Sequence, residues 1–210
     1  MRSLFLCAAL MLPAAAPAQT PEPQAPAQFR GVYATIDMRA TLDLVQRLGA
    51  KTGGTRRPAI REVLKNPSAY MPPVLYALAN ALSEDDPDDA VFWYHVGRIR
   101  AVYDSLRVRD TSARIGVVEL GKTLSTALRG AQFYQRGHLV GLAQKAIDWD
   151  RKNPRNYDQS WIALFGKVAR TSPGTDPAEV QLPESEWPKI LEHVYETHLK
   201  SVRDFAEVKR

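Results

Sequence analysis

The chain has 210 residues, of which 45% are hydrophobic and 24% are charged, and its formal net charge is +5. This composition is typical of a globular protein and excludes a chain that is disordered throughout. Acidic residues are interspersed with the basic ones, so no segment resembles the polybasic arm of a nucleic-acid-binding protein. We therefore expect no nucleic-acid partner, and at most a weak attraction to an anionic envelope surface.

Residues 1–18, "MRSLFLCAALMLPAAAPA", combine a basic residue, an apolar run and a small-residue pattern that ends at Ala18. These features predict a secretory signal peptide that is cleaved near Ala18. The apolar run is shorter than the roughly 20 residues that span a bilayer, and no later stretch approaches that length. We therefore expect a periplasmic or secreted protein with no transmembrane segment.

Cys7 is the only cysteine, and it lies inside the predicted signal peptide. A mature chain without cysteine excludes thiol catalysis, Cys-ligated zinc and disulfide bonds. Its stability must come from a buried core, which a chain of about 190 residues is long enough to form.

Residues 19–28 are rich in Pro, Ala and Gln and predict a disordered leader, so residues 29–210 are expected to form a single helical domain. Segment 29–37 is compatible with a short extended stretch. Apolar residues at helical spacing then predict an all-α fold of about seven helices. The expected helical segments are 38–49, 58–66, 71–84, 87–106, 110–130, 138–153 and 187–209, with a short apolar run at 160–166.

The first of these helices is expected to bury Leu42, Val45 and Leu48 and to end at Gly49. The helix at 110–130 is expected to run without a break until Gly130. The acidic turn "SEDDPDD" lacks the spacing of a calcium loop. It indicates a helix start instead, with Asp86 as the N-cap and Pro87 at the first helical position.

The stretch "DDAVFWYHVGRIRAVYD", Asp88 to Asp104, has a dense run of aromatic and basic residues. Helical geometry places Phe92, Val96, Ile99, Tyr103 and Leu106 on one stripe, which indicates core packing. Consecutive aromatic residues cannot all point inward from one face. Either this helix is central and surrounded, or an aromatic residue is exposed, so Trp93, His95, Arg98 and Arg100 remain candidate binding residues.

A second candidate surface is the segment "DWDRKNPRNYDQSW", where a helix ends. Aromatic and amide side chains favour recognition surfaces, which makes Trp149, Asn156, Tyr157 and Trp161 candidate binding residues. The alternative is that the tryptophans pack in the core and the asparagines cap turns.

Two other motifs resemble known sites. Gly116, Gly121, Lys122 and Thr123 satisfy the phosphate-loop pattern, but bulky residues of a helical stripe fill it and no buried strand precedes it, so we interpret it as a coincidence. His193 and His198 are five residues apart and lie on different sides of a helix, which disfavours a shared metal. We expect no metal and no cofactor.

Leu75, Leu78, Ala79 and Leu82, the acidic turn, and then Ala90, Trp93, Tyr94 and Gly97 resemble one tetratricopeptide or Sel1-like repeat. Ala143, Ala146, Asp150 and Pro154 resemble the closing helix of a second one. The resemblance covers about 35 residues, and no second copy appears at the family's period. It implies helix pairs and a protein-binding role, in an irregular bundle and not in a regular solenoid.

No nucleophile-elbow pattern occurs, although a pair of carboxylates brought together by the fold remains open. The sequence therefore favours an exported, non-catalytic protein-binding module, with an immunity protein that neutralises an antibacterial toxin as a narrower hypothesis. The alternatives are a periplasmic enzyme acting on envelope glycan or peptide, and a structural envelope or assembly factor.

Overall fold

The computed structural model describes residues 29–207 except 135, 173–175 and 177–179. The predicted signal peptide and leader lie outside the described residues. Nine α-helices occur in the described part: α1 (Arg39–Leu48), α2 (Gly53–Lys65), α3 (Pro72–Leu82), α4 (Pro87–Arg107), α5 (Ile115–Lys122), α6 (Thr126–Tyr134), α7 (Arg136–Lys152), α8 (Lys167–Thr171) and α9 (Trp187–Glu207). Short 3-10 helices η1 (Gly31–Thr35), η2 (Pro67–Ala69), η3 (Thr111–Arg114), η4 (Gln159–Phe165) and η6 (Glu184–Glu186) connect them.

The all-α class is confirmed, whereas the expected count of about seven helices is too low. No strand is present in the described residues, which hold one isolated bridge between Val108 and Gln181. None of the described helices is both long enough and apolar enough to cross a membrane.

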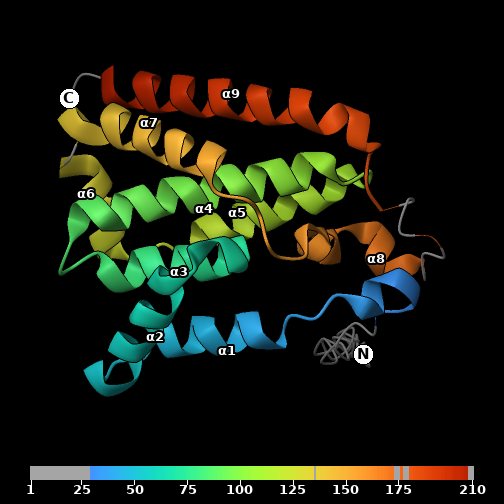
Figure 1. Ribbon diagram of the computed structural model, residues 1–210, viewed down its shortest axis with the longest axis horizontal. Coiled ribbons are helices and arrows are strands. Elements are labelled where there is room, and N and C mark those ends of the chain that lie inside the picture. Colours follow the sequence, from blue (N-terminus) through green and yellow to red (C-terminus); the bar gives the residue numbers. More distant parts are fainter. Residues whose placement is uncertain (1–28, 135, 173–175, 177–179, 208–210) are drawn as a thin grey trace, which may run out of the picture.

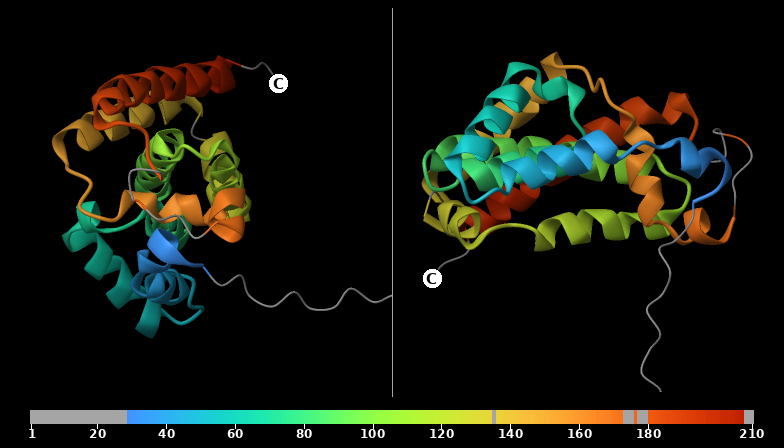
Figure 2. Two further views of the ribbon diagram at one scale, coloured as in Figure 1. Left: turned by 90° about the vertical axis from the view of Figure 1, so that its right-hand side faces the viewer. Right: turned by 90° about the horizontal axis from the view of Figure 1, so that it is seen from below.

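Helix α4 is the centre of the bundle. Helices α3, α7, α9 and α6 pack around it, and the end-on view in Figure 2 shows it enclosed by them. Phe92, Val96, Ile99 and Tyr103 of the predicted stripe are buried, and so is Trp93, whereas Leu106 at the end of the stripe is half-buried. Of the two arrangements that the sequence left open, the structure has the central, surrounded helix.

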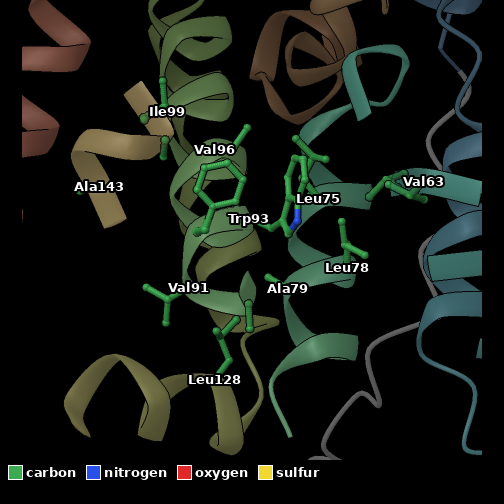
Figure 3. Packing of buried hydrophobic residues seen from close by; sticks show 14 of the residues in the cluster. Val63, Leu75, Leu78, Ala79, Val91, Trp93, Val96, Ile99, Leu128 and Ala143 are labelled. Atoms are coloured by element: carbon green, nitrogen blue, oxygen red, sulfur yellow. The ribbon is translucent and has the colours of Figure 1, made fainter. Parts of the chain in front are cut away.

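Helices α3 and α4 form a hairpin that makes the largest helix–helix contact of the described residues. Asp86 caps α4 by accepting a hydrogen bond of 3.1 Å from the backbone N–H of Asp89, so the predicted cap is confirmed. Figure 3 shows the interior that this hairpin shares with its neighbours. It includes Leu75, Leu78 and Ala79 of α3, Val91, Val96 and Ile99 of α4, Leu128 of α6 and Ala143 of α7.

Gly97 sets the distance between α3 and α4. A Cβ atom at this position would lie 3.0 Å from Cδ2 of Tyr76 and 3.2 Å from Cβ of Leu75. Both neighbours are fully buried, so neither can move aside easily.

We expect Gly97→Val to lower the free energy of unfolding by about 1–3 kcal/mol, because the added side chain overpacks the hairpin. Urea denaturation followed by circular dichroism measures the change. Gly141→Ala in α7 is the matched control, because nothing lies within 4 Å of its added Cβ. That variant should gain up to about 1 kcal/mol from helix propensity, and equal behaviour of the two variants would contradict the close contact at Gly97.

The N-terminal helices differ from the prediction in detail. Helix α1 ends at Gly49 as expected, but it buries Thr41, Leu44 and Leu48, while Leu42 is 61% exposed. Helix α2 begins at Gly53, so part of the expected loop is helical. Its inward face meets α1 and α3, and this contact decides which side chains are buried.

The expected helix 110–130 is broken into η3, α5 and α6. Asn80 of α3 holds the break: its Nδ2 donates to the carbonyl of Thr123 at 2.9 Å, and its Oδ1 accepts from the N–H of Ser125 at 2.8 Å. Ser125 then caps α6, accepting a hydrogen bond from the N–H of Leu128. Gly130 lies inside α6 and is not a stop signal.

Segment 29–37 was compatible with a short extended stretch, but its residues Gly31–Thr35 form the 3-10 helix η1. The apolar run at 160–166 lies mostly within η4. Asp158 caps the start of η4, because its side chain accepts a hydrogen bond of 2.8 Å from the N–H of Ser160. These elements lie near α8 at one end of the bundle (Figure 1) and form a second apolar cluster around Trp161.

Candidate functional site

A buried ion pair lies between α4 and α7. Nε of Arg100 in α4 donates to Oδ1 of Asp150 in α7 at 2.7 Å, and both side chains have no exposed surface. The second oxygen of Asp150 accepts hydrogen bonds from Arg155 and from the hydroxyl of Tyr195, the latter at 2.9 Å. Arg100 also donates to the carbonyl of Asn153 at 3.1 Å. This arrangement satisfies both oxygens of a carboxylate that would be costly to bury alone.

A second buried carboxylate, Asp104, lies one turn along α4 from Arg100. Its Oδ2 accepts hydrogen bonds from Nε1 of Trp161 at 2.8 Å and from the hydroxyl of Tyr157 at 3.1 Å. Burial raises the pKa of Asp104 to about 7, while the hydrogen bond from Trp161 and the charges of Arg155 and Arg107 act in the opposite direction. We call Arg100, Asp104, Arg107, Asp150, Arg155, Tyr157, Trp161 and Tyr195 the central polar network.

Aromatic rings surround the arginines of this network. The guanidinium of Arg100 lies 5.0 Å from the ring centre of Trp149, and that of Arg155 lies 4.6 Å from Tyr103. Arg107 lies 3.5 Å from the ring centre of Trp187. Contacts of this kind stabilise a cation that has been removed from water.

An open hollow lies beside the network. It has a volume of about 560 Å³, and we call it the groove. Its walls come from η1, from Arg109 just before η3, from the start of η4, and from the segment that leads into α9. The lining residues are Val32, Thr35, Ile36, Arg109, Asp158, Ser160, Val180, Gln181, Leu182, Pro183, Glu184 and Trp187.

Arg107 links the groove to the central polar network. Its guanidinium donates to Oε1 of Gln159 and, at 2.6 Å, to Oε1 of Gln181. Gln181 lines the groove, and its neighbour Leu182 donates a backbone hydrogen bond of 2.7 Å to the carbonyl of Arg107. Nε1 of Trp187 is held by the carbonyl of Leu182 at 2.9 Å. The groove wall is therefore fixed by buried groups behind it.

The structure places the binding residues predicted from the sequence in different parts of the protein. Arg100, Tyr157 and Trp161 come together in the central polar network, and Trp149 covers Arg100. Trp93 is buried with its ring 5.3 Å from that of Trp149, so it belongs to the core.

His95 and Arg98 lie away from this network, near α9. Asn156 is exposed, and its backbone N–H donates to the carbonyl of Ser68 at 2.9 Å. None of the eight candidate residues lines the groove.

Sequence reasoning missed Asp104, Arg107, Asp150 and Trp187. A signal for two of them was present, because Arg100, Asp104 and Arg107 follow at helical spacing on one face of α4. Charged residues that share a face with the buried Tyr103 could have indicated a buried network. Nothing local identifies Trp187 or Gln181, because their partner Arg107 is more than 70 residues away in sequence.

The phosphate-loop look-alike lies in α5 and its C-terminal cap, after the 3-10 helix η3. Gly116 packs against Ile162 and Phe165, and Lys122 forms an ion pair with Glu119 at 2.7 Å. Of the two C-terminal histidines, His193 is exposed and His198 is buried. In the part of the chain that the structure describes, no three His, Cys, Asp or Glu side chains gather as metal ligands do.

His95 and His198 form a buried pair between α4 and α9. Nε2 of His198 and Nδ1 of His95 share a hydrogen bond of 3.1 Å. Burial lowers the pKa of His198 to about 4, and the charge of Arg98 adds to this effect. Burial, His198 and Arg98 likewise lower the pKa of His95. Tyr94, Gln132 and Ser201 also lie beside the pair.

We expect the folded protein to lose about 2 kcal/mol of stability between pH 7 and pH 5 through His198. Its pKa is lower in the folded chain than in the unfolded chain, so stability falls as the pH falls from about 6.5 towards 4. Urea denaturation at several pH values measures the loss. His198→Gln should remove the part of the pH dependence that His198 contributes and leave the part that comes from His95, whose pKa is also lowered by burial. His193→Gln, at an exposed position, should leave the whole dependence unchanged.

No family model, no curated protein and no solved structure matches this chain.

Proposed function

We propose that this protein is an exported, non-catalytic protein-binding module, and that the groove receives a segment of its partner. The groove itself carries the proposal, because it joins a tryptophan, an arginine and apolar side chains in one open hollow of about 560 Å³. Tryptophan and arginine are enriched where binding energy concentrates in protein interfaces.

The fixed wall behind the groove supports this proposal. Trp187 is stacked on Arg107 and hydrogen-bonded to Leu182, so little side-chain freedom remains to be lost when a partner binds. Arg109, Asp158 and Glu184 add charges of both signs to the lining. Such a surface favours a polar peptide segment with one apolar anchor over a purely apolar ligand.

The resemblance to tetratricopeptide or Sel1-like repeats points in the same direction. Helices α3 and α4 carry its first part and form a close hairpin around Gly97. Proteins of these families bind other proteins, and we extend that role to this chain as part of the proposal.

A narrower form of the proposal is that the partner is an antibacterial toxin delivered to the periplasm, which this protein neutralises. The predicted signal peptide, the small size and the absence of a recognised catalytic motif in the sequence support it.

Co-expression with any effector that is encoded beside its gene tests this form. We expect protection from killing and a complex that survives co-purification. Absence of both would reject the immunity role.

The groove is tested by a matched pair of variants. Thr35→Arg places a long cation in the groove, whereas Thr55→Arg makes the same change at an exposed residue of α2. With the co-purified partner, Thr35→Arg should weaken binding at least about tenfold, and Thr55→Arg should bind normally. Equal affinities would show that another face binds.

One observation favours a second function, an enzyme that acts on envelope glycan or peptide. Asp158 and Glu184 both line the groove, and a pair of carboxylates is what glycosidic cleavage requires. Hydrolysis of purified cell-wall material that is lost in Glu184→Gln would establish this function. Hydrolysis that persists in Glu184→Gln, or no hydrolysis by the wild-type protein, would reject it.

A further inference from the structure

A second hollow lies between α4, α6, α7 and α9, apart from the groove. Its volume is about 300 Å³, and it contains the buried pair of His95 and His198. Arg98 of α4, Gln132 of α6 and Ser201 of α9 are further polar residues of its lining. Since an ordered water occupies about 30 Å³ of liquid volume, the space suits a ligand of roughly ten non-hydrogen atoms.

Two buried nitrogen atoms on the lining lack a hydrogen-bond partner in the described residues. They are Nε2 of His95, whose side chain is 3% exposed, and Nε2 of Gln132. Buried polar atoms are almost always paired in folded proteins, and an unpaired one is costly. The hollow therefore offers hydrogen-bonding capacity that the protein itself does not use.

The charge of the lining selects the sign of the ligand. Arg98 carries the full positive charge, and no Asp or Glu is present among the lining residues. Both histidines are neutral near pH 7 because burial and the charge of Arg98 lower their pKa values. A divalent metal would be repelled by Arg98 and would find no carboxylate ligand, whereas an anion would find a cation and neutral hydrogen-bonding groups.

Other lining residues of the hollow are apolar. Leu139 and Val202 are buried there, and Phe205 is 42% exposed at the edge. Ser201 is exposed as well, so the hollow is open to solvent and a ligand can enter without unfolding α9. A ligand that matches both the polar and the apolar lining residues carries an anionic head and a short apolar tail.

We propose that this hollow binds a small amphiphilic carboxylate, with its head against Arg98, His95 and Gln132 and its chain along Leu139, Val202 and Phe205. The inference does not depend on the function proposed for the groove, because the two hollows share no lining residue.

Isothermal titration of the purified protein with octanoate tests the proposal. We expect one binding site with a dissociation constant below about 1 mM. Octan-1-ol and inorganic phosphate should each bind at least about tenfold more weakly, because each lacks one half of the ligand. Arg98→Gln should weaken octanoate binding at least about tenfold, while Arg203→Gln, an exposed change of the same charge on α9, should have no effect.

If Arg98→Gln does not fold, a variant that blocks the hollow with a larger side chain still tests the proposal. Ser201→Leu changes an exposed residue and fills the hollow, so it should abolish octanoate binding while thermal denaturation shows a folded protein. No measurable binding of octanoate at 5 mM would overturn the proposal. Equal binding of octan-1-ol, or tight zinc binding that is lost in His95→Gln, would also overturn it.

Discussion

Replacing Asp150 with alanine is expected to lower the free energy of unfolding by about 3–5 kcal/mol, which makes it one of the most damaging single changes in the protein. The variant leaves the guanidinium of Arg100 fully buried without its carboxylate partner. It also removes the acceptor for Arg155 and Tyr195. Urea denaturation at pH 7 measures the change.

The exposed ion pair between Arg151 and Glu192 provides the control, since both side chains are about half exposed. Glu192→Ala should cost less than about 1 kcal/mol. Adding Arg100→Met to Asp150→Ala should recover part of the loss, because the unpaired buried charge is then removed. A loss below about 1 kcal/mol for Asp150→Ala alone would contradict a desolvated pair.

Replacing Trp161 with alanine is the second change with a large expected effect, a loss of about 3–5 kcal/mol. The ring is fully buried and forms an edge-on contact with Phe165, at 5.9 Å between centres. Trp161→Phe separates packing from hydrogen bonding, because it keeps most of the apolar ring but removes the donor to Asp104. We expect about 1–3 kcal/mol for this milder change.

The stability lost in Trp161→Phe should depend on pH. The pKa of Asp104 is already raised to about 7, and losing the Trp161 donor should raise it further. A raised pKa means that stability is present at low pH and is lost as the pH rises through that value. The deficit of Trp161→Phe should therefore grow between pH 6 and pH 9, and a deficit that is constant with pH would show that Asp104 is not the affected group.

Local signals allowed much of the helical framework to be predicted. The Asp86 cap, Pro87 at the start of α4, and Gly49 at the end of α1 act within one turn of the helix they delimit. Their effect is the same in any tertiary setting, which is why the corresponding boundaries agree with the prediction.

The errors lie where a distant residue decides the local structure. The break between α5 and α6 is held by Asn80, more than 40 residues earlier, so the continuous apolar stripe at 110–130 was misleading. The buried face of α1 is set by α2 and α3, which cover Leu44 and leave Leu42 in solvent. The spacing of apolar residues in α1 is compatible with burial of either face.

The candidate site was only partly predictable for the same reason. Arg100, Tyr157 and Trp161 were selected for their residue types, and they do meet, but inside the protein and not on its surface. The acidic partners Asp104 and Asp150 belong to helical stripes that look solvated when each helix is read alone. The groove joins η1, η4 and the start of α9, elements that no local pattern relates.

The His95–His198 pair also constrains the order in which the chain can fold. A chain that grows from its N-terminus can form the α3–α4 hairpin early, because the contacts of that hairpin are local in sequence. The flank of α4 that carries His95 stays open until α9 has been made, more than 100 residues later. Until then the central helix presents apolar surface and an unpaired imidazole to its surroundings, so an incomplete chain is the form most exposed to aggregation and proteolysis.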